Sequence, residues 1–179
     1  MNQSALMKPE FIPVLTKDEI QKRVAVLGAR ISSDYQNRDL LFVGVLKGAF
    51  IFLADLVRHV DIPAAIDFIQ VSSYGSGTCT SGNVQLDKPL GTDVRNKDVL
   101  IVEDIIDTGL TLTYLIEHMK SLHARTVKVC TLIDKKERRE TDVPIDYAGQ
   151  VVESGFLVGY GLDCDEKYRG LPGIYHLKF

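Results

Sequence analysis

The sequence predicts an α/β fold, an open parallel sheet flanked by helices, and three observations carry this prediction. Short apolar segments of strand length alternate with longer segments whose apolar residues have helical spacing. Repeated strand–helix–strand units imply parallel strands with helices on the faces of the sheet. The chain has 179 residues, of which 45% are hydrophobic and 25% charged, and this fits one domain with a substantial core.

The elements follow in order along the chain. The first helix is expected over residues 16–35, where Thr16 is placed to cap the helix and Glu19 follows three residues later. Further helices are expected over 49–60 and 110–122. Strands are expected over residues 39–46, 64–72, 99–102, 126–133 and 156–160. Residues 75–91 are rich in Gly, Ser and Thr, which predicts a long excursion that acts as a lid.

Composition narrows the class of protein. The net charge of −3 and the pI of about 5.8 weigh against a nucleic-acid partner, because such domains usually carry a basic excess. Three widely spaced cysteines without a CxxC pair indicate reduced thiols. The sequence shows neither a signal peptide nor an apolar run that could span a bilayer, so we expect a cytoplasmic protein with no membrane partner.

The most informative stretch is residues 99–111, in which an apolar strand is followed by Glu103, Asp104 and an Asp-Thr-Gly turn. A turn at a helix N-terminus offers free backbone amides, and glycine allows a phosphate to approach them. Hydroxyl groups add further donors, so we expect a phosphate cradle formed by Asp107, Thr108, Gly109, Leu110 and Thr111. The two acids can accept hydrogen bonds from sugar hydroxyls, although a solvated strand end is the alternative interpretation.

This ordered string matches the signature of type I phosphoribosyltransferases for 5-phosphoribosyl 1-diphosphate (PRPP). From about residue 18 to its end, the sequence resembles the hypoxanthine-guanine phosphoribosyltransferases. The resemblance implies purine salvage: phosphoribosyl transfer from PRPP to hypoxanthine or guanine, with Mg²⁺ as cofactor and a homodimer or homotetramer as the assembly. It also implies one domain over residues 1–179, with a core over about 36–150 and a small hood lobe from about 1–35 and 151–179.

Site residues follow from the same resemblance. Lys47, Gly48 and Arg169 correspond to residues that contact diphosphate, and the peptide bond between Leu46 and Lys47 can be cis in this family. Lys135 corresponds to a lysine that contacts the purine oxygen, and Asp107 to the general acid–base near N7. The purine site further includes Phe156, which stacks on the base, together with Leu157 and Asp163. Ser73 and Tyr74 resemble the start of a flexible lid.

Some assignments stay open at this stage. Metal contacts are implied for Asp163 and also for Glu103 and Asp104, which could instead bind only the ribose hydroxyls. Many family members have a basic residue at the position of Leu110, so here only its backbone amide remains. Taken alone, Lys135 belongs to the charged run 134–140, which is typical of a solvated face, and Phe156 is typical of a core. The alternative functions are a xanthine-preferring enzyme and a PRPP-sensing regulator that binds nucleic acid.

Overall fold

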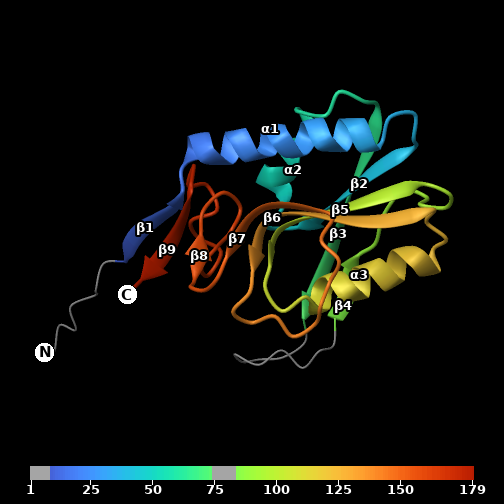
Figure 1. Cartoon of the computed structure of the whole chain (residues 1–179). Coiled ribbons are helices and arrows are strands. Elements are labelled where there is room, and N and C mark those ends of the chain that lie inside the picture. Colours follow the sequence, from blue (N-terminus) through green and yellow to red (C-terminus); the bar gives the residue numbers. More distant parts are fainter. Residues whose placement is uncertain (1–8, 74–83) are drawn as a thin grey trace, which may run out of the picture.

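The computed structural model describes residues 9–73 and 84–179 and contains two sheets (Figure 1). In spatial order, the six-stranded sheet consists of β4 (Val84–Lys88), β3 (Ala64–Ser73), β2 (Leu40–Leu46), β5 (Asp98–Ile106), β6 (Thr126–Lys135) and β7 (Tyr147–Val152). All its neighbouring strands pair in parallel except β4, which pairs antiparallel with β3 at one edge. The three-stranded sheet is antiparallel and consists of β1 (Glu10–Leu15), β9 (Ile174–Lys178) and β8 (Leu157–Val158).

Helices cover both faces of the larger sheet. The helices α1 (Lys17–Asp34) and α2 (Phe50–Val57) lie on one side of the sheet and α3 (Leu110–Ser121) on the other (Figure 1). Successive residues of β5 alternate between two cores: Leu100 and Val102 pack with α1 and α2, whereas Val99 and Ile101 pack with α3. This confirms the predicted α/β class with a mostly parallel sheet between helices.

The predicted cap of the first helix is present. The Glu19 amide donates to Thr16 Oγ1 at 3.3 Å, and the Thr16 amide donates to Glu19 Oε2 at 2.9 Å. The backbone hydrogen bond from Thr16 lowers the pKa of Glu19. Although this helix falls in the segment expected to form the small lobe, its buried residues share a core cluster with the six-stranded sheet.

Several predicted boundaries were wrong. The strand expected over 99–102 continues as β5 to Ile106, so Glu103 and Asp104 lie inside a strand rather than at a solvated end. Part of the excursion expected over 75–91 is the edge strand β4, which is paired through Gln70–Ser73 of β3. The strands β1, β7 and β9 were not predicted, because each depends on a partner that is distant in sequence or lies at a sheet edge.

The C-terminal segment is anchored against the loop that follows β2. A Cβ atom at Gly161 would collide with the backbone carbonyl of Gly48, so only glycine allows this approach. Next to it, the Tyr160 hydroxyl donates to Asp55 Oδ2 on α2 at 2.6 Å. The segment therefore brings its side chains to the carboxyl end of the larger sheet, where ligands bind in open α/β folds.

Among the described residues, no helix combines the length and the apolar character that crossing a bilayer requires.

Candidate active site

A cavity of about 370 Å³ opens at the carboxyl ends of β2, β5 and β6. Its lining includes nine residues predicted from the sequence: Lys47, Gly48, Asp104, Asp107, Lys135, Phe156, Leu157, Asp163 and Arg169. It also includes Ile105, Arg138 and Leu162, which the sequence analysis did not single out. Within the described ranges, the lining leaves out Glu103 and the predicted cradle residues 108–111. The predicted lid residue Tyr74 and the side chain of Ser73 lie outside the described part of the structure.

The predicted phosphate cradle joins β5 to α3. Gly109 has φ of +88°, and a Cβ atom there would lie 2.6 Å from the backbone oxygen of Thr141, so this turn requires glycine. The Thr108 carbonyl accepts hydrogen bonds at 3.0 Å from the amides of Glu140 and Thr141. The Leu110 amide donates a long hydrogen bond of 3.4 Å to Thr108 Oγ1. The first-turn amides of α3 lie at the N-terminal end of the helix, where such groups lack intrahelical acceptors and suit an anion.

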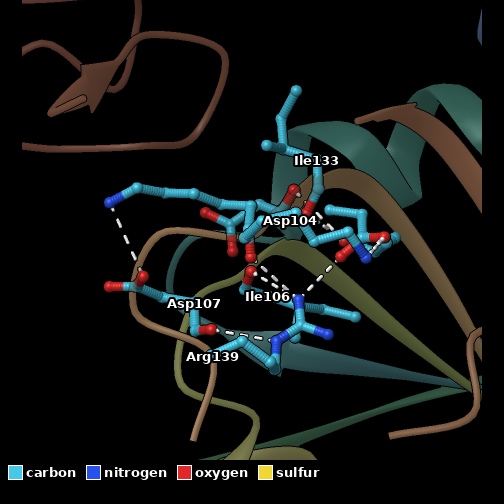
Figure 2. A network of polar contacts seen from close by, with 9 residues as sticks. Asp104, Ile106, Asp107, Ile133 and Arg139 are labelled. Atoms are coloured by element: carbon cyan, nitrogen blue, oxygen red, sulfur yellow. Dashed lines mark hydrogen bonds and ion pairs between the residues drawn. The ribbon is translucent and has the colours of Figure 1, made fainter. Parts of the chain in front are cut away.

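Arg139 supports the backbone that leads into the cradle (Figure 2). Its guanidinium donates to the carbonyl of Asp107 at 3.1 Å, to that of Ile106 at 3.2 Å and to Asp134 Oδ1 at 2.6 Å. Only 15% of the Arg139 side chain and 7% of that of Asp134 are exposed, so these members of the run 134–140 do not form the solvated face that such a run suggests. This role of Arg139 could not be predicted from the sequence, since two adjacent arginines in a charged run are usually exposed.

The two adjacent acids of β5 are poorly compensated. Asp104 is buried, and a Cβ atom at Gly48 would overlap its carboxylate, so glycine lets the loop after β2 pass directly over this acid. Glu103 Oε2 is buried without a hydrogen-bond partner among the described residues. Burial raises the pKa of both carboxyls, and the charge of Asp104 raises that of Glu103 further. Such groups favour a ligand that supplies hydrogen-bond donors or positive charge.

Asp107 lies between two cations. Its Oδ1 atom is 3.5 Å from Lys135 Nζ, and its Oδ2 atom is 3.5 Å from Arg138 Nη1. Both contacts exceed normal hydrogen-bond lengths, and Asp107 Oδ1 is buried with no hydrogen-bond partner among the described residues. The Lys135 side chain is 9% exposed and also lies 3.3 Å from Glu137 Oε2. A half-buried carboxylate near a lysine, open to the same cavity, can exchange a proton with a bound base.

Phe156 faces the cavity rather than the core. It is 53% exposed, although it directly precedes the buried strand β8. The amide of the preceding Gly155 donates to Glu137 Oε2 at 3.0 Å, which ties this turn to the end of β6. An exposed ring beside the buried amine of Lys135 can stack on a planar base.

A second group of charges lies at the mouth of the cavity. Arg169 Nη2 is 3.0 Å from Asp163 Oδ1 and 3.3 Å from Glu166 Oε1. The other oxygen of Glu166, Oε2, is 3.0 Å from Lys47 Nζ, and this hydrogen bond lowers the pKa of Glu166. The peptide bond between Leu46 and Lys47 is cis, as the family resemblance led us to expect. Glu166 was not predicted as a site residue, because in the sequence it resembles an ordinary exposed acid.

The acids of the cavity suit Mg²⁺ only in combination with a ligand. Among the described residues, no group of three or more His, Cys, Asp or Glu side chains could hold a metal ion. Asp104 and Asp163 both line the cavity and provide carboxylate oxygens. Mg²⁺ is commonly bound by one or two carboxylates together with substrate phosphates and water, so this donor set fits the ion when a phosphate supplies further oxygens.

The fold and the cavity define a sugar-phosphate transferase, and a family model for the phosphoribosyl transferase domain matches residues 14–165. The chain is 48% identical over 174 residues to the hypoxanthine-guanine phosphoribosyltransferase of Bacillus subtilis, covering 97% of each chain. A crystal structure of the hypoxanthine phosphoribosyltransferase of Staphylococcus aureus matches with a TM-score of 0.90 and 44% identity, covering 93% of this chain and 90% of that one. The chain belongs to the hypoxanthine-guanine phosphoribosyltransferase family.

Proposed function

We propose that this chain transfers the phosphoribosyl group of PRPP to hypoxanthine or guanine, giving IMP or GMP and diphosphate. The observation that carries the proposal is one cavity in which Asp104, Asp107, Lys135 and Phe156 meet beside a glycine-dependent cradle at a helix N-terminus. The likeness to enzymes that are named for this reaction supports it.

The purine binds between Phe156 and Lys135 in this proposal. The exposed ring stacks on the base, with Leu157 beside it, and the Lys135 ammonium donates to the oxygen at position 6. Adenine has an amino group at that position, so a donor would face the buried Lys135 ammonium in place of an acceptor, at a cost in affinity. The site therefore selects 6-oxopurines.

PRPP occupies the other parts of the cavity. The 5-phosphate lies on the amides of residues 108–111, and Glu103 and Asp104 accept hydrogen bonds from the ribose hydroxyls. The diphosphate is bound by Arg169, Lys47 and the Gly48 amide at the mouth. Asp163, with Glu103 and Asp104 as further candidates, would hold Mg²⁺, and the ion would supply positive charge for the departing diphosphate.

Asp107 acts as the general acid–base. It lies between the cradle and Lys135, so its carboxylate faces the side on which the purine N7 is expected. Moving a proton at N7 assists attack by N9 on the sugar, and such assistance typically contributes about 10²–10⁴-fold.

Water exclusion and assembly complete the proposal. The segment that begins at Ser73 and Tyr74 covers the site during the reaction, because an activated ribosyl group would otherwise be hydrolysed. The enzyme works in the cytoplasm as a homodimer or homotetramer. Residues 1–35 and 151–179 contribute a small lobe to the core formed by 36–150, although α1 within the first range packs on that core.

A panel assay tests the proposal. PRPP and Mg²⁺ are supplied with hypoxanthine, guanine, xanthine or adenine, and nucleotide formation is measured. We expect turnover of hypoxanthine and guanine with negligible use of adenine. Dominant use of xanthine would favour the alternative specificity, and PRPP binding without turnover of any base would favour a regulator.

Lys135→Gln tests the base contact within this panel. We expect kcat/KM for hypoxanthine to fall about tenfold or more, because one hydrogen bond from a charged donor is lost. Lys136→Gln is the matched control, since Lys136 is the adjacent lysine but pairs with Asp134. Equal losses in both variants would remove Lys135 from the base site.

A further inference from the structure

Glu166 lies on both cations that we propose for the diphosphate. One carboxylate oxygen is 3.0 Å from Lys47 Nζ and the other is 3.3 Å from Arg169 Nη2, so a single anionic group bridges the loop after β2 and the C-terminal segment. Both cations line the cavity. A bridging anion with one oxygen on each cation is also the arrangement expected of a bound diphosphate.

A tight hairpin holds the backbone of Glu166 in place. Cys164 and Lys167 exchange two backbone hydrogen bonds of 3.1 Å, with Asp165 at φ of +51° and Glu166 at φ of +60° between them. The Glu166 amide also donates to Asp163 Oδ2 at 2.8 Å. The left-handed region is unusual for glutamate, so this conformation depends on its surroundings. Any displacement of the carboxylate is then a rotation of its exposed side chain, without rearrangement of the hairpin.

We propose that Glu166 is an intramolecular competitor of diphosphate, an inference that rests on the proposed function of this site. The side chains of Lys47 and Glu166 are 57% and 63% exposed, and ion pairs of this kind change an equilibrium constant by at most about fivefold each. The carboxylate is therefore easily displaced. A diphosphate on the same cations replaces these pairs and repels Glu166, so either way the carboxylate weakens diphosphate binding.

This competition has a consequence for turnover. Diphosphate leaves the site as the product, and return of Glu166 to Lys47 and Arg169 compensates the two cations as it departs. The carboxylate thus favours release of diphosphate while leaving purine binding at Lys135 and Phe156 unaffected.

Glu166→Gln tests the inference through the dissociation constant of diphosphate, measured by calorimetry with Mg²⁺. We expect that constant to fall about 3- to 10-fold, since the two ion pairs of this exposed carboxylate no longer compete. Asp165→Asn is the matched control: it removes the same charge from the same hairpin, but Asp165 is 89% exposed and has Lys167 as its partner at 3.7 Å. We expect a change below about 1.5-fold for this control. IMP, which lacks a diphosphate, should bind all three proteins equally.

Other outcomes contradict the inference. If Glu166→Gln and Asp165→Asn both bind diphosphate more tightly by the same factor, only long-range charge matters. Weaker diphosphate binding in Glu166→Gln would mean that Glu166 positions the cations. Glu166→Asp, which keeps the charge on a shorter side chain, should lie between the wild type and Glu166→Gln. If the wild type turns over hypoxanthine but Glu166→Gln binds diphosphate unchanged, this inference alone fails, whereas a wild type without turnover would overturn the proposed function as well.

Discussion

The two ends of β5 carry buried carboxylates in opposite electrostatic settings. At the start of the strand, Asp98 is fully buried, and it accepts hydrogen bonds from Arg125 and from Thr126 Oγ1. The bond from Arg125 lowers the pKa of Asp98. At the other end, burial raises the pKa of Glu103 and Asp104, and neither acid has a cation within ion-pair distance among the described residues.

This difference indicates that Asp98 stabilises the fold, whereas Glu103 and Asp104 bind a ligand. A buried charge with its hydrogen bonds complete contributes to the stability of the native state, whereas a buried charge without partners opposes folding. Asp104 lines the cavity and Glu103 directly precedes it in β5, so the loss of stability is explained if a ligand supplies the missing donors.

Asp107, which directly follows β5, is an exception to this comparison. It has two cations nearby, yet we assign it to proton transfer rather than to the stability of the fold. We expect Asp107→Asn to lower the single-turnover rate of nucleotide formation by at least about 100-fold, through loss of proton transfer. The dissociation constant of PRPP should change less than about threefold, because backbone amides hold the phosphate. Rapid-quench kinetics and a binding titration measure the two quantities.

The control for Asp107 is Asp142→Asn, an exposed acid close in sequence to the residues that support the cradle. It should leave the single-turnover rate unchanged. An unchanged rate in Asp107→Asn would remove this residue from acid–base catalysis, and a large rise in the dissociation constant of PRPP would assign it to binding instead.

The second prediction concerns Asp98, the compensated carboxylate at the start of β5. We expect Asp98→Asn to lower the free energy of unfolding by about 2–3 kcal/mol at neutral pH, because charged hydrogen bonds to a buried acceptor are lost. The dissociation constant of PRPP should not change, since Asp98 lies at the opposite end of the strand from the cavity. Chemical denaturation measures the stability.

The pH dependence of this effect has a definite sign. Since the pKa of Asp98 is lowered in the folded protein, its stabilisation is complete above the unfolded value of about 3.9 and disappears as pH falls through the folded value. The difference between wild type and Asp98→Asn should therefore narrow below about pH 4. Asp39→Asn is the control: it removes one exposed pair with Lys97, worth about 0.5 kcal/mol, and an equal loss there would contradict the special role of Asp98.

The sequence predicted the central part of the fold because its strands and helices carry strong local patterns. The runs that became β2, β5 and β6 are largely apolar, and α1 has both a clear apolar face and its capping residues. In contrast, β1 pairs with β9 across nearly the whole chain, with Glu10 opposite Lys178, and no local pattern reveals such a partner.

The site residues divide in the same way, into those with a recognisable sequence pattern and those without one. The spacing of the Asp-Thr-Gly turn after a strand identified Asp104 and Asp107, and the family resemblance identified the other seven predicted residues of the cavity lining. Arg139 and Glu166 were missed because each acts through a contact made in space, to the carbonyls behind the cradle or to Lys47. Their neighbours in sequence are charged and exposed, so nothing local distinguishes them.

The most direct test of the contrast within β5 is Glu103→Gln, with stability and PRPP binding measured on the same protein. Because the pKa of Glu103 is raised in the folded state, ionisation reduces stability above the unfolded value of about 4.3, and this loss grows as pH rises. We predict that the variant is more stable than wild type by about 1 kcal/mol at pH 8, that the gain narrows towards pH 5, and that the dissociation constant of PRPP with Mg²⁺ rises about tenfold. A variant that is less stable than wild type and binds PRPP unchanged would contradict the account.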